Sequence, residues 1–138
     1  MMYLLDTNIV SETVRPVPDH NVAIWLLSQP TETLWISVLT IAEIERGIAL
    51  AEQRNATRAR QLSGWLEGLL AQYQDQIVPM DRAAARVWGR MAAATPDLDS
   101  DAAIAATAAV HGWTVATRNV KDFGRFGVPV FNPFAASA

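Results

Sequence analysis

The stretch Tyr3-Leu4-Leu5-Asp6-Thr7-Asn8 decides how this chain folds. Three apolar residues run directly into a carboxylate, which is followed by two residues that are typical of helix starts. A short apolar run of this kind predicts a fully buried strand of a parallel sheet. Asp6 then lies at the carboxyl end of the strand, and in open α/β sheets this edge is where ligands bind. We therefore predict a ligand site at this edge, completed by polar residues that follow other strands.

Short apolar runs and helical patterns alternate along the rest of the chain. Further strands are predicted at 34–37, 76–79 and 113–117, with a fifth, edge strand at 128–132. Helical spacing predicts a short helix at 7–13 and a helix at 20–29 capped by Asp19. Two longer helices follow: one starts at Ser37 or Thr40 and ends at Ala51, and the next is capped by Asn55 or Thr57 and runs to about Tyr73. The last two predicted helices are 81–94, capped by Asp81, and 101–111, capped by Ser100 and ended by Gly112. Residues 95–100 and 118–127 are predicted loops. The alternation predicts one domain, residues 1–138, with a three-layer α/β/α fold around a parallel sheet of four to five strands.

Composition narrows the classes of protein to which the chain can belong. Of its 138 residues, 51% are hydrophobic and none is cysteine, which indicates a globular domain without disulfides or thiolate metal sites. No apolar run approaches the length of a membrane span, and no signal-peptide pattern is present, so we expect a cytoplasmic protein with no membrane partner. The net charge of −3 excludes a protein that coats nucleic acid. Any contact with nucleic acid must therefore be local, or depend on a metal ion or an oligomer.

Candidate chemistry follows from where the acids fall. Asp6 ends the first strand, Glu43 lies in the first turns of the helix after the second strand, and Asp101 begins its helix. Because the carboxyl ends of parallel strands share one edge, we expect these three carboxyl groups to lie on the order of 3–7 Å apart, within reach of one cation. Oxygen ligands without His or Cys suit Mg²⁺ or Mn²⁺, which would activate a water and hold a phosphate oxygen.

Each of these residues also has a simpler interpretation when it is taken alone. Asp6 fits a turn or helix cap, Glu43 fits a solvated helix position, and Asp101 fits a polar loop with Asp97 and Asp99. The arginines at 82, 86 and 90 repeat at helical spacing, which is typical of a solvated face, although they could face RNA. Spacing alone therefore indicates an α/β domain with an acidic site, for which hydrolysis is one possible activity.

Four segments, in order along the chain, resemble the four sequence motifs of PIN domains. They are Leu4-Leu5-Asp6-Thr7-Asn8-Ile9-Val10-Ser11-Glu12, Ser37-Val38-Leu39-Thr40-Ile41-Ala42-Glu43-Ile44-Glu45-Arg46-Gly47, Asp101-Ala102-Ala103-Ile104-Ala105-Ala106-Thr107-Ala108 and Val115-Ala116-Thr117-Arg118-Asn119-Val120-Lys121-Asp122-Phe123. Each segment alone is a weak signal, but four in family order form a specific one. The tail Val130-Phe131-Asn132-Pro133-Phe134 further resembles VapC toxins of the FitB-like branch.

The resemblance implies a metal-dependent endoribonuclease, the toxin of a VapBC-like pair, with RNA as substrate and a VapB-like antitoxin as partner. Asp6, Glu43 and Asp101 match the family's core acids around Mg²⁺ or Mn²⁺. Three further matches belong to a second metal site or water network: Thr117, a hydroxyl position; Asn119, where many relatives have a fourth acid; and Asp122, three residues further on.

Two further expectations concern contacts with other molecules. Arg46 lies three residues after Glu43, and Arg118 and Lys121 lie close to Asp122, so we predict that these basic residues steer the RNA backbone. PIN toxins form dimers, and apolar residues that look exposed in the sequence would be buried by a homodimer. These residues are Trp35, Trp113 and Phe134.

Two other classes of protein remain as alternatives. A receiver-type signalling domain is also doubly wound, but it needs paired acids at the first strand and a lysine after the fifth, and the single lysine here is Lys121. Asn119 leaves open a PIN fold that has lost catalysis and only binds RNA or a partner. The intact acids at 6, 43 and 101 argue against it.

Overall fold

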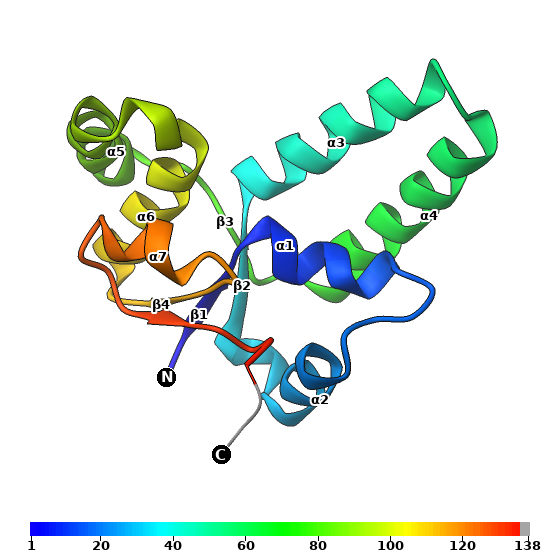
Figure 1. Cartoon of the computed structure of the whole chain (residues 1–138), viewed down its shortest axis with the longest axis horizontal. Coiled ribbons are helices and arrows are strands. Elements are labelled where there is room, and N and C mark those ends of the chain that lie inside the picture. The colour runs from blue at the N-terminus through cyan, green and yellow to red at the C-terminus, as the bar shows by residue number, and fades with distance from the viewer. Residues whose placement is uncertain (136–138) are drawn as a thin grey trace.

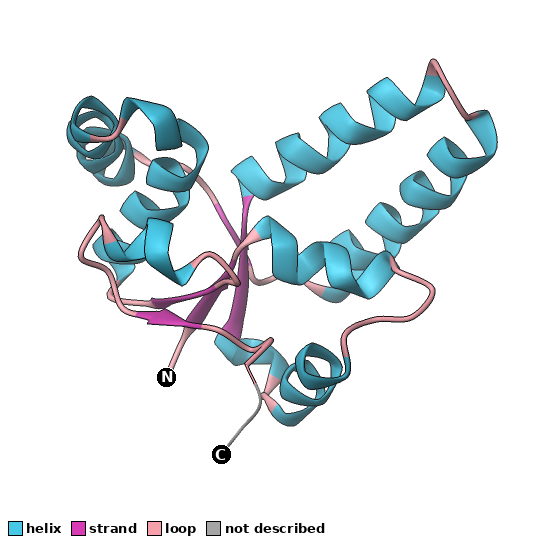
Figure 2. Ribbon diagram, viewed as in Figure 1, coloured by secondary structure: helices cyan, strands magenta, loops and turns pink. Residues whose placement is uncertain are grey.

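A parallel sheet forms the middle of the molecule (Figure 1, Figure 2). The computed structural model describes residues 1–135. Five strands lie in the order β3-β2-β1-β4-β5, with the bounds Tyr3–Leu5 (β1), Leu34–Ser37 (β2), Ile77–Val78 (β3), Thr114–Ala116 (β4) and Val130–Phe131 (β5). All neighbouring strands are parallel. The predicted sheet, with its first strand between the second and fourth, is therefore confirmed.

Helices cover both faces of this sheet (Figure 2). Within residues 1–135 they are α1 (Thr7–Val10), α2 (His20–Ser28), α3 (Val38–Glu52), α4 (Ala56–Gln72), α5 (Arg82–Ala94), α6 (Asp99–His111) and α7 (Val120–Gly124). A 3₁₀ turn, Ser11–Val14, continues α1. Side chains accept hydrogen bonds from the first turns of α2 to α5, which satisfies backbone N–H groups that have no partner within the helix. These capping residues are Asp19, Ser37, Asn55 and Asp81. Asp19 and Asp81 are the predicted caps, and Ser37 and Asn55 are each one of the two residues predicted to begin their helix.

Two segments differ from the sequence-based expectation. Helix α6 begins at Asp99 instead of Asp101, and Ser100 lies inside its first turn, so the predicted Ser100 cap is wrong. The helix extends because Trp88 Nε1 on α5 donates to both the carbonyl oxygen and Oδ1 of Asp99, at 3.1 and 3.2 Å. The predicted loop 118–127 contains α7, which forms because Phe123 is fully buried against the sheet. Contacts with another helix and with the sheet therefore decide the structure of both segments.

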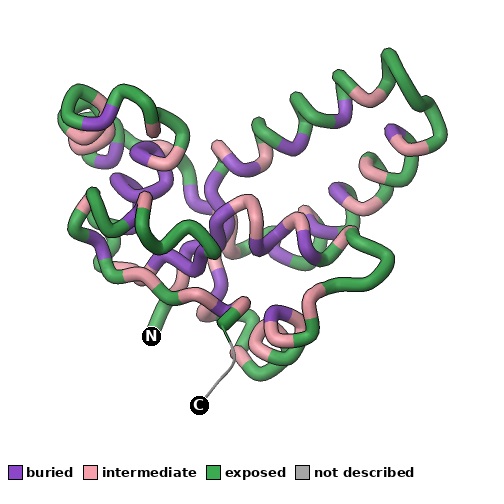
Figure 3. The backbone as a smooth tube through the Cα atoms, in the orientation of Figure 1, coloured by how far each residue is buried: buried purple, intermediate pink, exposed green. Residues whose placement is uncertain are grey.

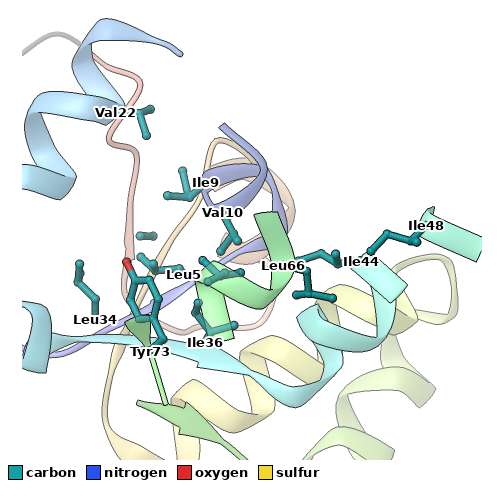
Figure 4. Close-up of a cluster of buried hydrophobic side chains, with 12 residues drawn as sticks. Leu5, Ile9, Val10, Val22, Leu34, Ile36, Ile44, Ile48, Leu66 and Tyr73 are labelled. Carbon is teal, nitrogen blue, oxygen red and sulfur yellow. The ribbon is translucent and has the colours of Figure 1, made fainter. Parts of the chain in front are cut away.

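The core consists of two hydrophobic clusters on the two faces of the sheet. Successive residues of a strand point to opposite faces, so Leu5 belongs to the cluster under α1 to α4, which Figure 4 shows. Leu4 belongs to the other cluster, with Ile104 of α6 and Phe123 of α7. Residues 102–108 of α6 are all buried, which its many alanines permit because small side chains let neighbouring elements approach closely (Figure 3). No helix within residues 1–135 is long and apolar enough to cross a membrane.

Candidate active site at the carboxyl edge of the sheet

Asp6 is the innermost acidic residue of the site. It follows β1 directly, is only 5% exposed, and caps α1 by accepting a hydrogen bond from the backbone N–H of Thr7 to Oδ1, at 2.8 Å. Its Oδ2 accepts from the hydroxyl of Thr117, after β4, at 2.8 Å and from Nδ2 of Asn8 at 3.1 Å. The carboxylate is therefore held in one orientation by three donors from two segments of the chain.

Glu43 reaches the same edge of the sheet from α3. Its Oε2 accepts a hydrogen bond from the hydroxyl of Thr7 at 3.0 Å, and Thr7 immediately follows Asp6. The Thr7 hydroxyl also lies 3.3 Å from that of Thr40, one turn earlier on α3. This contact between α1 and α3 brings Glu43 beside Asp6, as the sequence predicted.

Asp101 enters the site from the first turn of α6, where the partial positive charge of the helix tolerates a carboxylate. Burial raises its pKa above the ordinary value, and the neighbouring charges of Asp122 and Glu43 raise it further. The pKa of Asp6 rises to about 6, chiefly through burial, with smaller contributions from Asp101 and Glu43. The hydrogen bonds from Thr117 and Thr7 oppose this rise. The predicted acids therefore lie close enough to feel one another's charge.

The segment after β4 supplies a polar wall beside Asp6. Thr117 is fully buried, donates to Asp6 and accepts from the backbone N–H of Asn119 at 2.9 Å. The side chain of Asn119 is exposed and makes no capping hydrogen bond to α7. Asp122, on α7, is the residue whose charge acts on Asp101. The acid three residues after Asn119 thus supplies the negative charge at this side of the site.

The donor chemistry of this edge fits a hard divalent cation. Carboxylate oxygens come from three separate elements, with hydroxyl and amide groups around them. Within residues 1–135, however, no three acidic or histidine side chains are placed so that they could hold one ion together. The predicted spacing within reach of one cation is therefore not observed. Without a cation between them, the like-charged carboxylates repel one another.

A groove of about 710 Å³ leads away from the acids, between α1 with its 3₁₀ turn and the hairpin of α3 and α4. Glu43 and Thr7 lie at its wall, together with two of the predicted RNA-contacting residues, Arg46 and Arg118. Lys121, the third, is exposed on α7 and is not among the residues that line this groove. Reasoning from the sequence missed Arg15 and Arg58, which also line it, because no local pattern places them beside the acids.

The class of protein follows from a match to a known family. The PIN domain model matches residues 3–128, and the chain belongs to the PIN domain family. Within that family it is similar to proteins of toxin–antitoxin systems, which confirms the resemblance seen in its sequence motifs.

Two curated proteins and one solved structure illustrate the similarity. Toxin FitB of Neisseria gonorrhoeae (strain ATCC 700825 / FA 1090) is 38% identical over 139 residues, which cover 96% of this chain and 99% of that protein. VapC ribonuclease Y4jK of Sinorhizobium fredii (strain NBRC 101917 / NGR234) is 34% identical over 140 residues, with coverage of 96% and 98%. The crystal structure of FitAcB from Neisseria gonorrhoeae superposes with a TM-score of 0.87 at 35% identity, covering 98% of this chain and 100% of that one.

Proposed function

We propose that this chain is a metal-dependent endoribonuclease and the toxin of a VapBC-like pair. The observation that carries the proposal is the meeting of Asp6, Glu43 and Asp101, from three elements, at the carboxyl edge of a PIN-domain sheet. Relatives that match this chain along their whole length are named as toxins and ribonucleases. RNA hydrolysis is the activity that this acidic site and these relatives together support.

In the proposed reaction the protein holds the ligands and the RNA in place. With their side chains turned toward one ion, Asp6, Glu43 and Asp101 would bind Mg²⁺ or Mn²⁺, and such an ion supplies an acidic bound water and a positive charge near phosphate. Asp6 must lose its proton to act as a ligand, and its pKa of about 6 allows this at neutral pH. Thr117 and Asn8 orient its carboxylate. Asp122 adds negative charge on the side where Asn119 replaces a fourth acid.

Cleavage of RNA should require a divalent cation. We expect the purified protein to cut a mixed RNA pool in Mg²⁺ or Mn²⁺, to stop when EDTA is in excess, and to resume when the ion is restored. Asp101→Asn is the matched variant, since it keeps the shape of the side chain and removes one charge. Cleavage that persists in EDTA, or that is unchanged in this variant, would overturn the proposal. RNA that is bound but remains uncut in both ions would favour the alternative, a PIN fold that only binds.

The proposed partner is a VapB-like antitoxin, and we place the pair in the cytoplasm, where RNA substrates are found. Solved structures similar to this chain include FitAB bound to an IR36 DNA fragment, at 34% identity and a TM-score of 0.86. That relative is therefore part of an assembly on DNA. Co-expression with a VapB-like antitoxin should give a complex that does not cut RNA.

We also propose a homodimer, although the three apolar residues that suggested one in the sequence are packed within the chain and are not free to form an interface. The Trp35 and Trp113 rings stack on each other within the chain, with centroids 4.8 Å apart, and Phe134 packs against the core. Exposed apolar side chains occur instead at Val38 and Leu50 of α3. Light scattering at micromolar concentration should give twice the mass of the 15.1 kDa chain. A monomer at every concentration would exclude the dimer.

A further inference from the structure

The groove that leads away from the acids carries a concentration of positive charge that the rest of the chain lacks. Four arginines and two glutamates line it, whereas the whole chain has a net charge of −3. The arginines come from four segments that are distant in sequence: the end of the 3₁₀ turn, α3, α4 and the segment after β4. We propose that the RNA strand beside the cleaved phosphate lies in this groove, and that Arg15 and Arg58 bind its phosphates. This inference rests on the proposed nuclease function.

Most of these guanidinium groups are available to a ligand. Within residues 1–135, Arg46, Arg58 and Arg118 form no ion pair with a carboxylate, in contrast to Arg125, which pairs with Asp97 at 3.1 Å. Arg15 lies 3.4 Å from Glu12, but the same carboxylate also accepts the backbone N–H of Asp19 at 2.7 Å. Because 59% of the Arg15 side chain is exposed, against 7% of the Glu12 side chain, phosphate can still reach the outer face of the Arg15 guanidinium.

Arg118 is held at the end of the groove nearest the acids. Its guanidinium carbon lies 3.8 Å from the centroid of the Phe134 ring, a cation–π contact. Its backbone N–H donates to Oδ1 of Asn8 at 3.3 Å, and Nδ2 of Asn8 donates to Asp6. The backbone at Arg118 is therefore linked through Asn8 to the innermost acid, so we place the scissile phosphate at this end of the groove.

The groove suits a single strand rather than a duplex. Its apolar wall includes Leu62 and Trp65, which are half-buried, and Nε1 of Trp65 is fixed by a 2.8 Å hydrogen bond to the Thr13 hydroxyl. Most of the arginines around this apolar surface are exposed. Bases can face the apolar wall while phosphates face the arginines, the arrangement that single-strand-binding proteins use. A volume of about 710 Å³ is also in the range of small-ligand sites, which is too small for a double helix.

Binding of a short labelled single-stranded RNA of mixed sequence, measured by fluorescence anisotropy in EDTA over a salt series, tests the proposal. Each phosphate contact on a single strand contributes roughly 0.7 to the slope of log K against log salt. Arg58→Ala and Arg15→Ala should each lower the slope by about 0.7 and the affinity by about fivefold at 0.1 M salt. Arg58→Lys should keep the slope, because the charge remains.

Arg86→Ala on α5 is the matched control, since it removes the same charge and Arg86 does not line the groove. It should leave both affinity and slope unchanged. Equal losses in Arg58→Ala and Arg86→Ala, or no loss in either, would overturn the groove assignment. If Arg58→Ala fails to fold by circular dichroism, Arg58→Gln replaces it under the same criteria.

These experiments distinguish a failure of the groove assignment from a failure of the proposed nuclease function. If RNA is cut only with a divalent ion but Arg58→Ala and Arg15→Ala bind it normally, the nuclease stands and the groove assignment fails. If both variants lose affinity but no metal ion supports cleavage, the groove binds RNA and the nuclease proposal fails. A duplex of the same sequence should bind more weakly than the single strand, and preference for the duplex would contradict the path described here.

Discussion

Asp6→Asn should make the metal-free protein more stable at neutral pH while it removes RNA cleavage. In the folded protein, burial raises the pKa of Asp6 from 3.8 to about 6. The unfolded chain releases this proton near the ordinary value, so between these two pKa values the folded state binds more protons than the unfolded state. The contribution of Asp6 to the stability of the folded protein is thus greatest below the pKa that Asp6 has in the unfolded chain, and it is lost as pH rises through about 6.

The expected size follows from the pKa shift. A rise of about two units corresponds to about 3 kcal/mol of folding free energy, present at acid pH and lost at neutral pH. Asparagine cannot ionise, so the difference in free energy of unfolding between variant and wild type should increase by up to about 3 kcal/mol from pH 4 to pH 7. The lost hydrogen-bond pattern with Thr117 adds an offset that does not depend on pH. Denaturant unfolding in EDTA at several pH values measures this difference.

The same substitution should have the opposite effect on activity. Asp6 is a proposed metal ligand, and loss of a group that merely supports ligands already costs about 10- to 100-fold in metal affinity or activity. Cleavage by Asp6→Asn should fall further than this. Added Mn²⁺ should raise the melting temperature of the wild type and leave that of the variant unchanged, because only a bound ligand stabilises the folded state.

Asn119→Ala is the control for this prediction. It alters an exposed, uncharged side chain beside the same site, and we expect a smaller effect on cleavage and no pH-dependent change in stability. A difference in stability between Asp6→Asn and wild type that is flat with pH would contradict the buried, ionisable Asp6 described here.

Phe123→Ala should destabilise the protein more than substitutions elsewhere in the segment after β4. Phe123 is fully buried, and its ring packs in the cluster that contains Leu4 and Ile104. Removing a buried aromatic ring loses its transfer free energy and leaves a cavity, which together cost about 3–5 kcal/mol. For a domain of this size the melting temperature should fall by roughly 10 °C. Denaturant unfolding followed by circular dichroism measures the change.

Two further variants serve as controls for the loss of stability expected in Phe123→Ala. Phe123→Leu keeps most of the volume and should cost less than about 1.5 kcal/mol. Leu27→Ala changes a side chain that is 88% exposed and should stay within about 0.5 kcal/mol of wild type. If Phe123→Ala resembled Leu27→Ala, α7 would not be packed on the sheet, and the placement of Asp122 beside Asp101 would lose its structural basis.

Local patterns in the sequence predicted the sheet and most of its helices. Leu4 and Leu5 form a buried strand because both faces of a parallel sheet are covered. Asp19 and Asp81 cap helices because their carboxylates accept nearby backbone N–H groups. These interactions join residues that are close in sequence, so the pattern alone reveals them. The start of α6 and the existence of α7 depend on Trp88 and Phe123 finding distant partners, and their local sequence reads as loop.

The order of strands and helices along the chain is enough to place Asp6, Glu43 and Asp101 at the carboxyl edge of the sheet, because parallel strands all end on the same side. The surroundings of these acids depend instead on how the helices pack. The packing of α7 brings the charge of Asp122 near Asp101, and the hairpin of α3 and α4 brings Arg58 into a groove with Arg15. Those neighbours are set by contacts between elements far apart along the chain, which carry no signal in local periodicity.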